Sequence, residues 1–75
     1  MELKTTLIVE ERDVNNVLIN TYGIGDVVTL TSNKGTKTGR INSIKYNAIE
    51  LDLSKKFSGK YSIFDTSNIF NIVKQ

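Results

Sequence analysis

The second half of the chain consists of short runs in which apolar residues alternate with polar ones. The clearest run is 48–53, where Ile49, Leu51 and Leu53 alternate with Glu50 and Asp52. A period of two places successive side chains on opposite faces of a β-strand, so the apolar set is expected inside and the two carboxylates in water. Similar runs at 26–31, 36–46 and 69–73, and one with Tyr61 and Ile63 inside, predict a five-stranded antiparallel sheet over residues 26–73.

Glycines mark the turns and bends of this predicted sheet. Gly35 ends a stretch with the composition of a hairpin loop, because Asn and Gly tolerate a positive φ angle. Gly39 lies inside the run 36–46, and an interior glycine in a strand marks a sharp bend or the close approach of another strand. The fold class is therefore predicted to be mainly β, with five strongly bent strands in a small antiparallel SH3-like or Sm-like barrel.

The N-terminal part is predicted to add one helix over residues 11–22. Asp13 suits the start of a helix and Gly23 suits its end. The apolar residues that share one face at helical spacing are Val14, Val17, Leu18 and Tyr22. Residues 1–10 form either a loosely ordered arm or an extra strand. With 75 residues, the chain is expected to be a single domain, 1–75.

Composition argues against a catalytic or metal-binding protein. The sequence has no Cys and no His, so it offers no disulfide, no thiolate ligand and no imidazole ligand or base. No Ser or Thr has a recognisable base beside it, and phosphate-loop and dinucleotide motifs are missing. We therefore expect no enzyme activity, no cofactor and no metal site.

Charge is distributed unevenly along the chain. Residues 1–26 carry two basic and five acidic residues, a net charge of −3, whereas residues 27–75 carry eight basic and three acidic residues, a net charge of +5. A positive sheet suits phosphate binding, although an ordinary soluble surface also carries scattered cations. No signal peptide and no membrane-length apolar segment are apparent, so a cytoplasmic protein that does not contact membranes is expected.

Two segments are candidate contacts for nucleic acid. The turn Lys45-Tyr46-Asn47 offers a cation, a ring and an amide, which suit neutralising a phosphate, stacking on a base and bonding to its edge. The alternative is a tight turn with a half-buried ring. Arg40, together with Lys34 and Lys37 on the first hairpin and the following strand, is expected to add general attraction to phosphate, with ordinary surface charges on a polar sheet face as the alternative. The second segment is the loop that contains Lys55, Lys56, Phe57 and Lys60. Its alternative role is a solubilising loop that shields a sheet edge.

The motifs Asn33-Lys34-Gly35, Gly39-Arg40-Ile41 and Asn68-Ile69-x-x-Ile72-Val73 resemble the Sm-like superfamily, and their spacing is similar to its bacterial branch, the Hfq family of RNA chaperones. The resemblance implies a homo-oligomeric ring of six or seven copies, in which strand four of one copy pairs with strand five of the next. It also implies that RNA is held by the loops 45–47 and 65–68. The Asp-Gln-aromatic and Lys-His motifs of the bacterial family are absent from these loops.

These observations lead to two functional hypotheses. The first is a ring-forming Sm-like protein that binds RNA, or another single-stranded nucleic acid, without catalysis. The alternative is a small SH3-like or Sm-like barrel that acts as a protein-interaction or regulatory accessory module. The first hypothesis predicts salt-sensitive binding of oligonucleotides, whereas the second predicts a specific protein partner.

Overall fold

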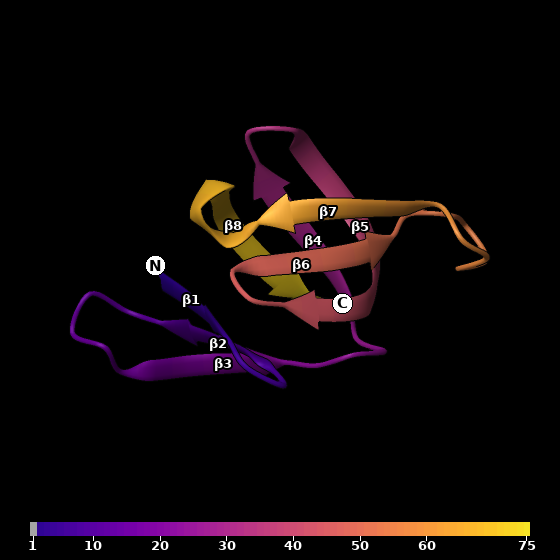
Figure 1. Cartoon of the computed structure of the whole chain (residues 1–75). Helices are drawn as coiled ribbons and strands as arrows, with labels where there is room; N and C mark the ends of the chain where they lie inside the picture. The colour runs from indigo at the N-terminus through magenta and orange to yellow at the C-terminus, as the bar shows by residue number, and fades with distance from the viewer. Residues whose placement is uncertain (1) are drawn as a thin grey trace.

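The computed structural model describes residues 2–75 and contains two antiparallel sheets (Figure 1). The first sheet has the order β1-β2-β3 and is formed by β1 (Glu2–Thr5), β2 (Val9–Arg12) and β3 (Leu18–Tyr22). The second has the order β7-β6-β5-β4-β8 and is formed by β4 (Val27–Ser32), β5 (Gly35–Lys45), β6 (Ala48–Asp52), β7 (Tyr61–Asp65) and β8 (Ile69–Lys74). A single 3-10 turn, η1 (Thr66–Asn68), connects β7 to β8.

The helix predicted over 11–22 is absent, and residues 2–75 contain no α-helix. The segment forms most of a β2–β3 hairpin instead. Its turn is set by Asp13, whose carboxylate accepts hydrogen bonds from the backbone N–H groups of Asn15 and Val17, and by Asn16, whose φ angle is 63°. An Asx turn of this kind competes with helix initiation, and β-branched residues on both sides favour strands. The prediction of a helix is therefore wrong.

The five strands of the second sheet lie where five strands were expected, but they do not close into a barrel. The strand order leaves β7 and β8 at opposite edges of an open sheet. The first sheet packs against part of the apolar side of this sheet and contributes Leu3, Val9 and Tyr22 to the common core. The prediction of an SH3-like or Sm-like barrel with an N-terminal helix is wrong, because residues 2–75 form two sheets without an α-helix and the edge strands β7 and β8 do not pair with each other.

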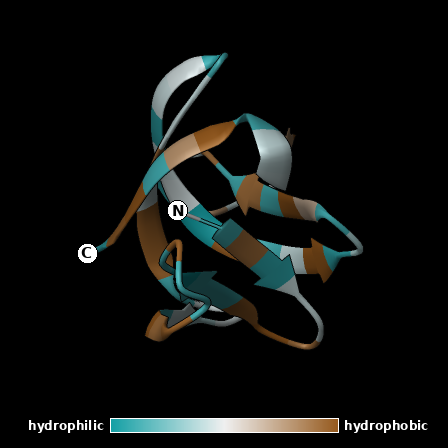
Figure 2. Ribbon diagram, turned by 90° about the vertical axis from the view of Figure 1, so that its left-hand side faces the viewer, coloured by the Kyte–Doolittle hydropathy of each residue, from teal (hydrophilic) through white to brown (hydrophobic). Residues whose placement is uncertain are grey.

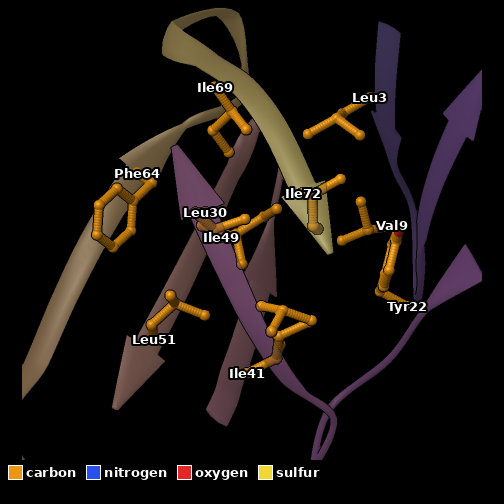
Figure 3. Close-up of a cluster of buried hydrophobic side chains, with 11 residues drawn as sticks. Leu3, Val9, Tyr22, Leu30, Ile41, Ile49, Leu51, Phe64, Ile69 and Ile72 are labelled. Carbon is orange, nitrogen blue, oxygen red and sulfur yellow. The ribbon is translucent and has the colours of Figure 1, made fainter. Parts of the chain in front are cut away.

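The core side chains come from both sheets, and Figure 3 shows them together. The residues contributed by the five-stranded sheet are Val28, Leu30, Ile41, Ile49, Leu51, Phe64, Ile69 and Ile72. Along several strands, hydrophobic residues are interrupted by hydrophilic ones, as the colour changes in Figure 2 show. One side of each strand therefore supports the core, while the other remains available for contacts.

Gly39 permits the close approach of β5 to the end of β6, as its position inside a strand predicted. A Cβ atom at this position would lie 2.5 Å from the backbone oxygen of Asp52 and 3.0 Å from a methyl group of Leu53. Shortly after it, the register between β5 and β6 shifts between Ile41 and Ser43. The bend and the shift together decide which β5 side chains reach the outer side of the sheet.

Over residues 2–75, no helix has the length and the apolar character that crossing a membrane requires.

Candidate functional site

The outer face is defined here as the side of β5, β6 and β7 that points away from the core. On β6, the residues of the opposite side, Ile49 and Leu51, are fully buried, which confirms the alternation predicted for this strand. Strand pairing aligns the outer face in three rows, each crossing from β5 through β6 to β7. The rows are Arg40, Asp52 and Tyr61; Ser43, Glu50 and Ile63; and Lys45, Ala48 and Asp65.

Tyr61 and Ile63 belong to this outer face and not to the core. Their side chains are 55% and 47% exposed, whereas Phe64 is only 2% exposed. The prediction that they face inward is wrong, because β7 carries apolar residues on both sides and Phe64, whose ring has no polar group, occupies the core position. Asp65 shares the face of Tyr61 and Ile63, and this carboxylate is the sequence signal that identifies the solvent side.

Asp52 was expected to face water but is almost completely buried under the following loop. Its carboxylate accepts hydrogen bonds from the backbone N–H groups of Ser54, Gly59 and Lys60 at 3.0 to 3.2 Å, and from the Ser54 hydroxyl at 2.7 Å. Burial acts to raise the pKa of this carboxyl, but the four hydrogen bonds outweigh burial and lower its pKa. The loop 53–60 is therefore folded around one ionised carboxylate.

The loop 53–60 brings several predicted site residues together. The Arg40 guanidinium lies 5.0 Å from the centre of the Phe57 ring, a cation–π contact between β5 and the loop. The backbone of Phe57 is left-handed, with φ of 52°, and Gly59 next to the Tyr61 ring has φ of 119°. We call the resulting group the basic–aromatic cluster, and its members are Arg40, Lys55, Lys56, Phe57, Lys60 and Tyr61. Sequence reasoning found all of them except Tyr61.

The predicted turn Lys45-Tyr46-Asn47 lies at the other end of β6. Tyr46 is 87% exposed, so the alternative of a half-buried ring is wrong. Asn47 has φ of 56°; its backbone N–H donates to Thr5 Oγ1 at 2.7 Å and its carbonyl accepts from the Thr66 N–H at 3.0 Å. The turn is thus tied to both β1 and η1. It is separated from the basic–aromatic cluster by the five residues of β6, about 16 Å, so the predicted residues form two groups on one face.

The acidic residues of the five-stranded sheet are engaged within the fold. Asp65 accepts from the Ser67 hydroxyl at 2.7 Å and from the Ser67 N–H at 2.9 Å, and these bonds lower its pKa. Glu50 accepts from Asn42 at 2.8 Å and from Ser43 at 3.2 Å. Together with the buried Asp52, these are the carboxylates of residues 27–75. Each is held by hydrogen bonds from uncharged donors.

The cations of the outer face are, by contrast, without carboxylate partners. Across the described chain, the salt bridges are Arg12 with Glu10 at 3.3 Å and Lys74 with Asp26 at 3.4 Å, and neither lies on the outer face. The basic residues of the two predicted groups are therefore free to neutralise an external anion.

A cavity of about 450 Å³ lies where the turn 45–47, η1 and β1 meet. Its lining includes the acidic residues Glu2 and Asp65 and the apolar residues Leu3 and Ile69, and none of the described residues that line it is basic. The loop 65–68, to which the resemblance assigned RNA binding, therefore contributes no cation to this cavity.

Among residues 2–75, no three His, Cys, Asp or Glu side chains are grouped so that they could hold a metal ion. No protein-family model matches the chain, and neither a curated protein nor a solved structure shows significant similarity to it. The resemblance to the Sm-like superfamily therefore stays a prediction from motifs.

Proposed function

We propose that the chain is a non-catalytic module that binds single-stranded nucleic acid on the outer face of β5, β6 and β7. The observation that carries this proposal is a difference between the charged groups of the face: its carboxylates accept hydrogen bonds from uncharged donors, and its more numerous cations have no acidic partner. The free cations are Arg40, Lys45, Lys55, Lys56 and Lys60. Such a surface attracts a phosphate backbone and releases its condensed counterions.

The exposed rings favour a single strand over a duplex. Tyr61 and Tyr46 present more than half of their surface to solvent, one in each group of cations. Unpaired bases stack on aromatic side chains, whereas a duplex hides the faces of its bases. A nucleic-acid strand that runs along β6 therefore meets cations and one tyrosine ring at each end of β6.

The proposal is tested by fluorescence anisotropy with a labelled single-stranded RNA at several salt concentrations. For single strands, the logarithm of the binding constant falls with the logarithm of salt by about 0.7 per neutralised phosphate. Replacing Lys55, Lys56 and Lys60 together by Gln is expected to lower the affinity and to reduce this slope by about 2. Their side chains are exposed, so the fold is expected to persist.

The matched control replaces Lys4 and Lys37 by Gln, because both lysines are exposed but lie off the outer face. This variant is expected to keep most of the affinity and of the slope. Salt-insensitive binding by the native chain, or equal losses in the loop variant and in the control, would refute the proposed site.

A protein-interaction role is the second candidate function, favoured by the β2–β3 hairpin. Its tip exposes Val14, Val17, Leu18 and Ile19, with exposed fractions from 47% to 92%. Exposed apolar groups on a protruding hairpin suit a protein contact, and a second copy of the chain is the first partner to test. Sedimentation velocity over a concentration series measures this, with Val14→Ser/Val17→Ser expected to weaken association. A native chain that stays monomeric would exclude self-association and with it the predicted ring.

A further inference from the structure

Glu50 occupies the middle row of the outer face, between the two groups of cations. It is paired with Ser43 on β5 and with Ile63 on β7, and it is only partly buried. One carboxylate oxygen, Oε1, accepts hydrogen bonds from both Asn42 Nδ2 and Ser43 Oγ. Within residues 2–75, no hydrogen bond is made to the second oxygen, Oε2. The side chain is thus fixed by two donors and presents a free, charged acceptor at the centre of the face.

The surroundings of this free oxygen suit a nucleobase. Ile63, the neighbour of Glu50 on β7, exposes 47% of its surface, and Tyr61 lies two residues along the same strand. An apolar side chain and a ring beside a fixed acceptor would hold the plane of a base while its edge is read. A carboxylate in this position accepts hydrogen bonds but cannot donate them.

An acceptor of this kind distinguishes bases by their donor groups. Cytosine presents an exocyclic amino group, which donates, and acidic side chains accept from it. Uracil has a carbonyl oxygen in the corresponding position, and its single ring N–H lies between two carbonyl oxygens that face the carboxylate unfavourably. We infer that Glu50 is a specificity-determining residue that favours bases carrying an amino group over uracil. This inference rests on the proposed function, and it assigns a sequence preference to the same face.

The experiment compares labelled oligocytidine and oligouridine RNAs of equal length, about eight nucleotides, at one salt concentration. Both are pyrimidine strands with the same backbone, so the ratio of their dissociation constants isolates the base edge. The native chain is expected to bind oligocytidine roughly 3- to 10-fold more tightly, as one charge-assisted hydrogen bond at a partly exposed position permits.

Two variants separate base reading from simple electrostatics. Glu50→Gln offers both a donor and an acceptor, so both probes are expected to bind more tightly and the ratio is expected to fall to about 1. Glu2→Gln removes an exposed negative charge from the other sheet and is expected to leave the ratio unchanged. Circular dichroism verifies that both variants remain folded.

Equal binding of the two probes by the native chain, or a preference for oligouridine, would overturn the role of Glu50 while leaving the proposed function in place. A preference for oligocytidine that persists in Glu50→Gln would also overturn it, because the selectivity would then come from another residue. Failure of both probes to bind would refute the proposed function and this inference together.

Discussion

Replacing Gly39 by Ala tests the packing on which the outer face depends. The added Cβ would lie 2.5 Å from the Asp52 backbone oxygen, roughly 1 Å closer than a comfortable van der Waals contact. The obstructing atom belongs to the backbone, so β5 and β6 must separate at the row that contains Arg40. Overpacking of this kind costs about 1–3 kcal/mol.

The unfolded chain offsets part of this cost, because Ala has fewer backbone conformations than Gly and gains about 0.4–1 kcal/mol. The middle values of these two ranges leave a net loss of about 1 kcal/mol, which lowers the melting temperature of a domain of this size by roughly 4–8 °C. Thermal denaturation followed by circular dichroism measures the shift. Nucleic-acid affinity is expected to fall as well, because Asp52 organises the loop 53–60.

Gly23→Ala is the matched control. A Cβ at Gly23 would meet no atom within 4 Å, and the φ angle of this residue is not positive. The variant is expected to be as stable as the native chain or slightly more stable. If Gly39→Ala melted at the same temperature as Gly23→Ala, the close approach of β5 to Asp52 would be refuted.

Three further predictions concern the loop 53–60, the exposed tyrosine rings and the aspartate carboxyl groups. Asp52→Asn is expected to loosen the loop 53–60, because an amide offers one acceptor oxygen instead of two. Faster amide hydrogen exchange confined to 53–60 would show this loosening, and unchanged exchange would contradict it. Tyr61→Ala is expected to lower RNA affinity roughly 5- to 150-fold, the range for one stacked base, with Tyr46→Ala as the parallel test at the other end; full affinity in both variants would remove stacking from the site. The pKa values of Asp26, Asp52 and Asp65 are lowered in the folded chain, so their contribution to stability is complete above their ordinary value of 3.8 and is lost as the pH falls through the lowered values. Urea midpoints are therefore expected to be level at neutral pH and to fall in acid, and a midpoint that rises in acid would show the sign to be wrong.

The sheet of residues 27–74 was predictable because its strands follow local rules. Alternation places Ile49 and Leu51 in the core, and the glycine inside β5 indicates the close approach of β5 to β6. Which side of β7 faces the core was not predictable in this way, since Tyr61, Ile63 and Phe64 are all apolar enough to be buried. Which of these side chains is buried depends on the space that the other core residues leave, and those residues are distant in sequence.

The N-terminal part was mispredicted because two periods fit the same residues. Val14, Val17, Leu18 and Tyr22 match a helical face, but three of these four side chains are exposed and only Tyr22 is buried. What decides the outcome is the pairing of β2 with both β1 and β3, a non-local interaction that helical spacing does not reveal. The same pairing places Leu3, Val9 and Tyr22 in the core.

The candidate site was predicted in its parts but not in its arrangement. Arg40 and the loop 53–60 are twelve or more residues apart in sequence, and β5–β6 pairing brings them into contact through Phe57. Glu50 was predicted to face water but not to belong to the site, because an exposed carboxylate on a strand usually serves solubility. Its fixed orientation depends on Asn42 and Ser43, which the register shift in β5 places beside it.

The hydrogen bonds of Asp52 fix the path of the loop 53–60 largely without using the side chains of that loop. Three of its four hydrogen bonds come from backbone N–H groups, which every residue except proline possesses. Lysines 55, 56 and 60 can therefore be exchanged for other residues while the path of the loop is retained. Substitutions at these three lysines are thus expected to change the charge that the loop presents without changing how the loop folds.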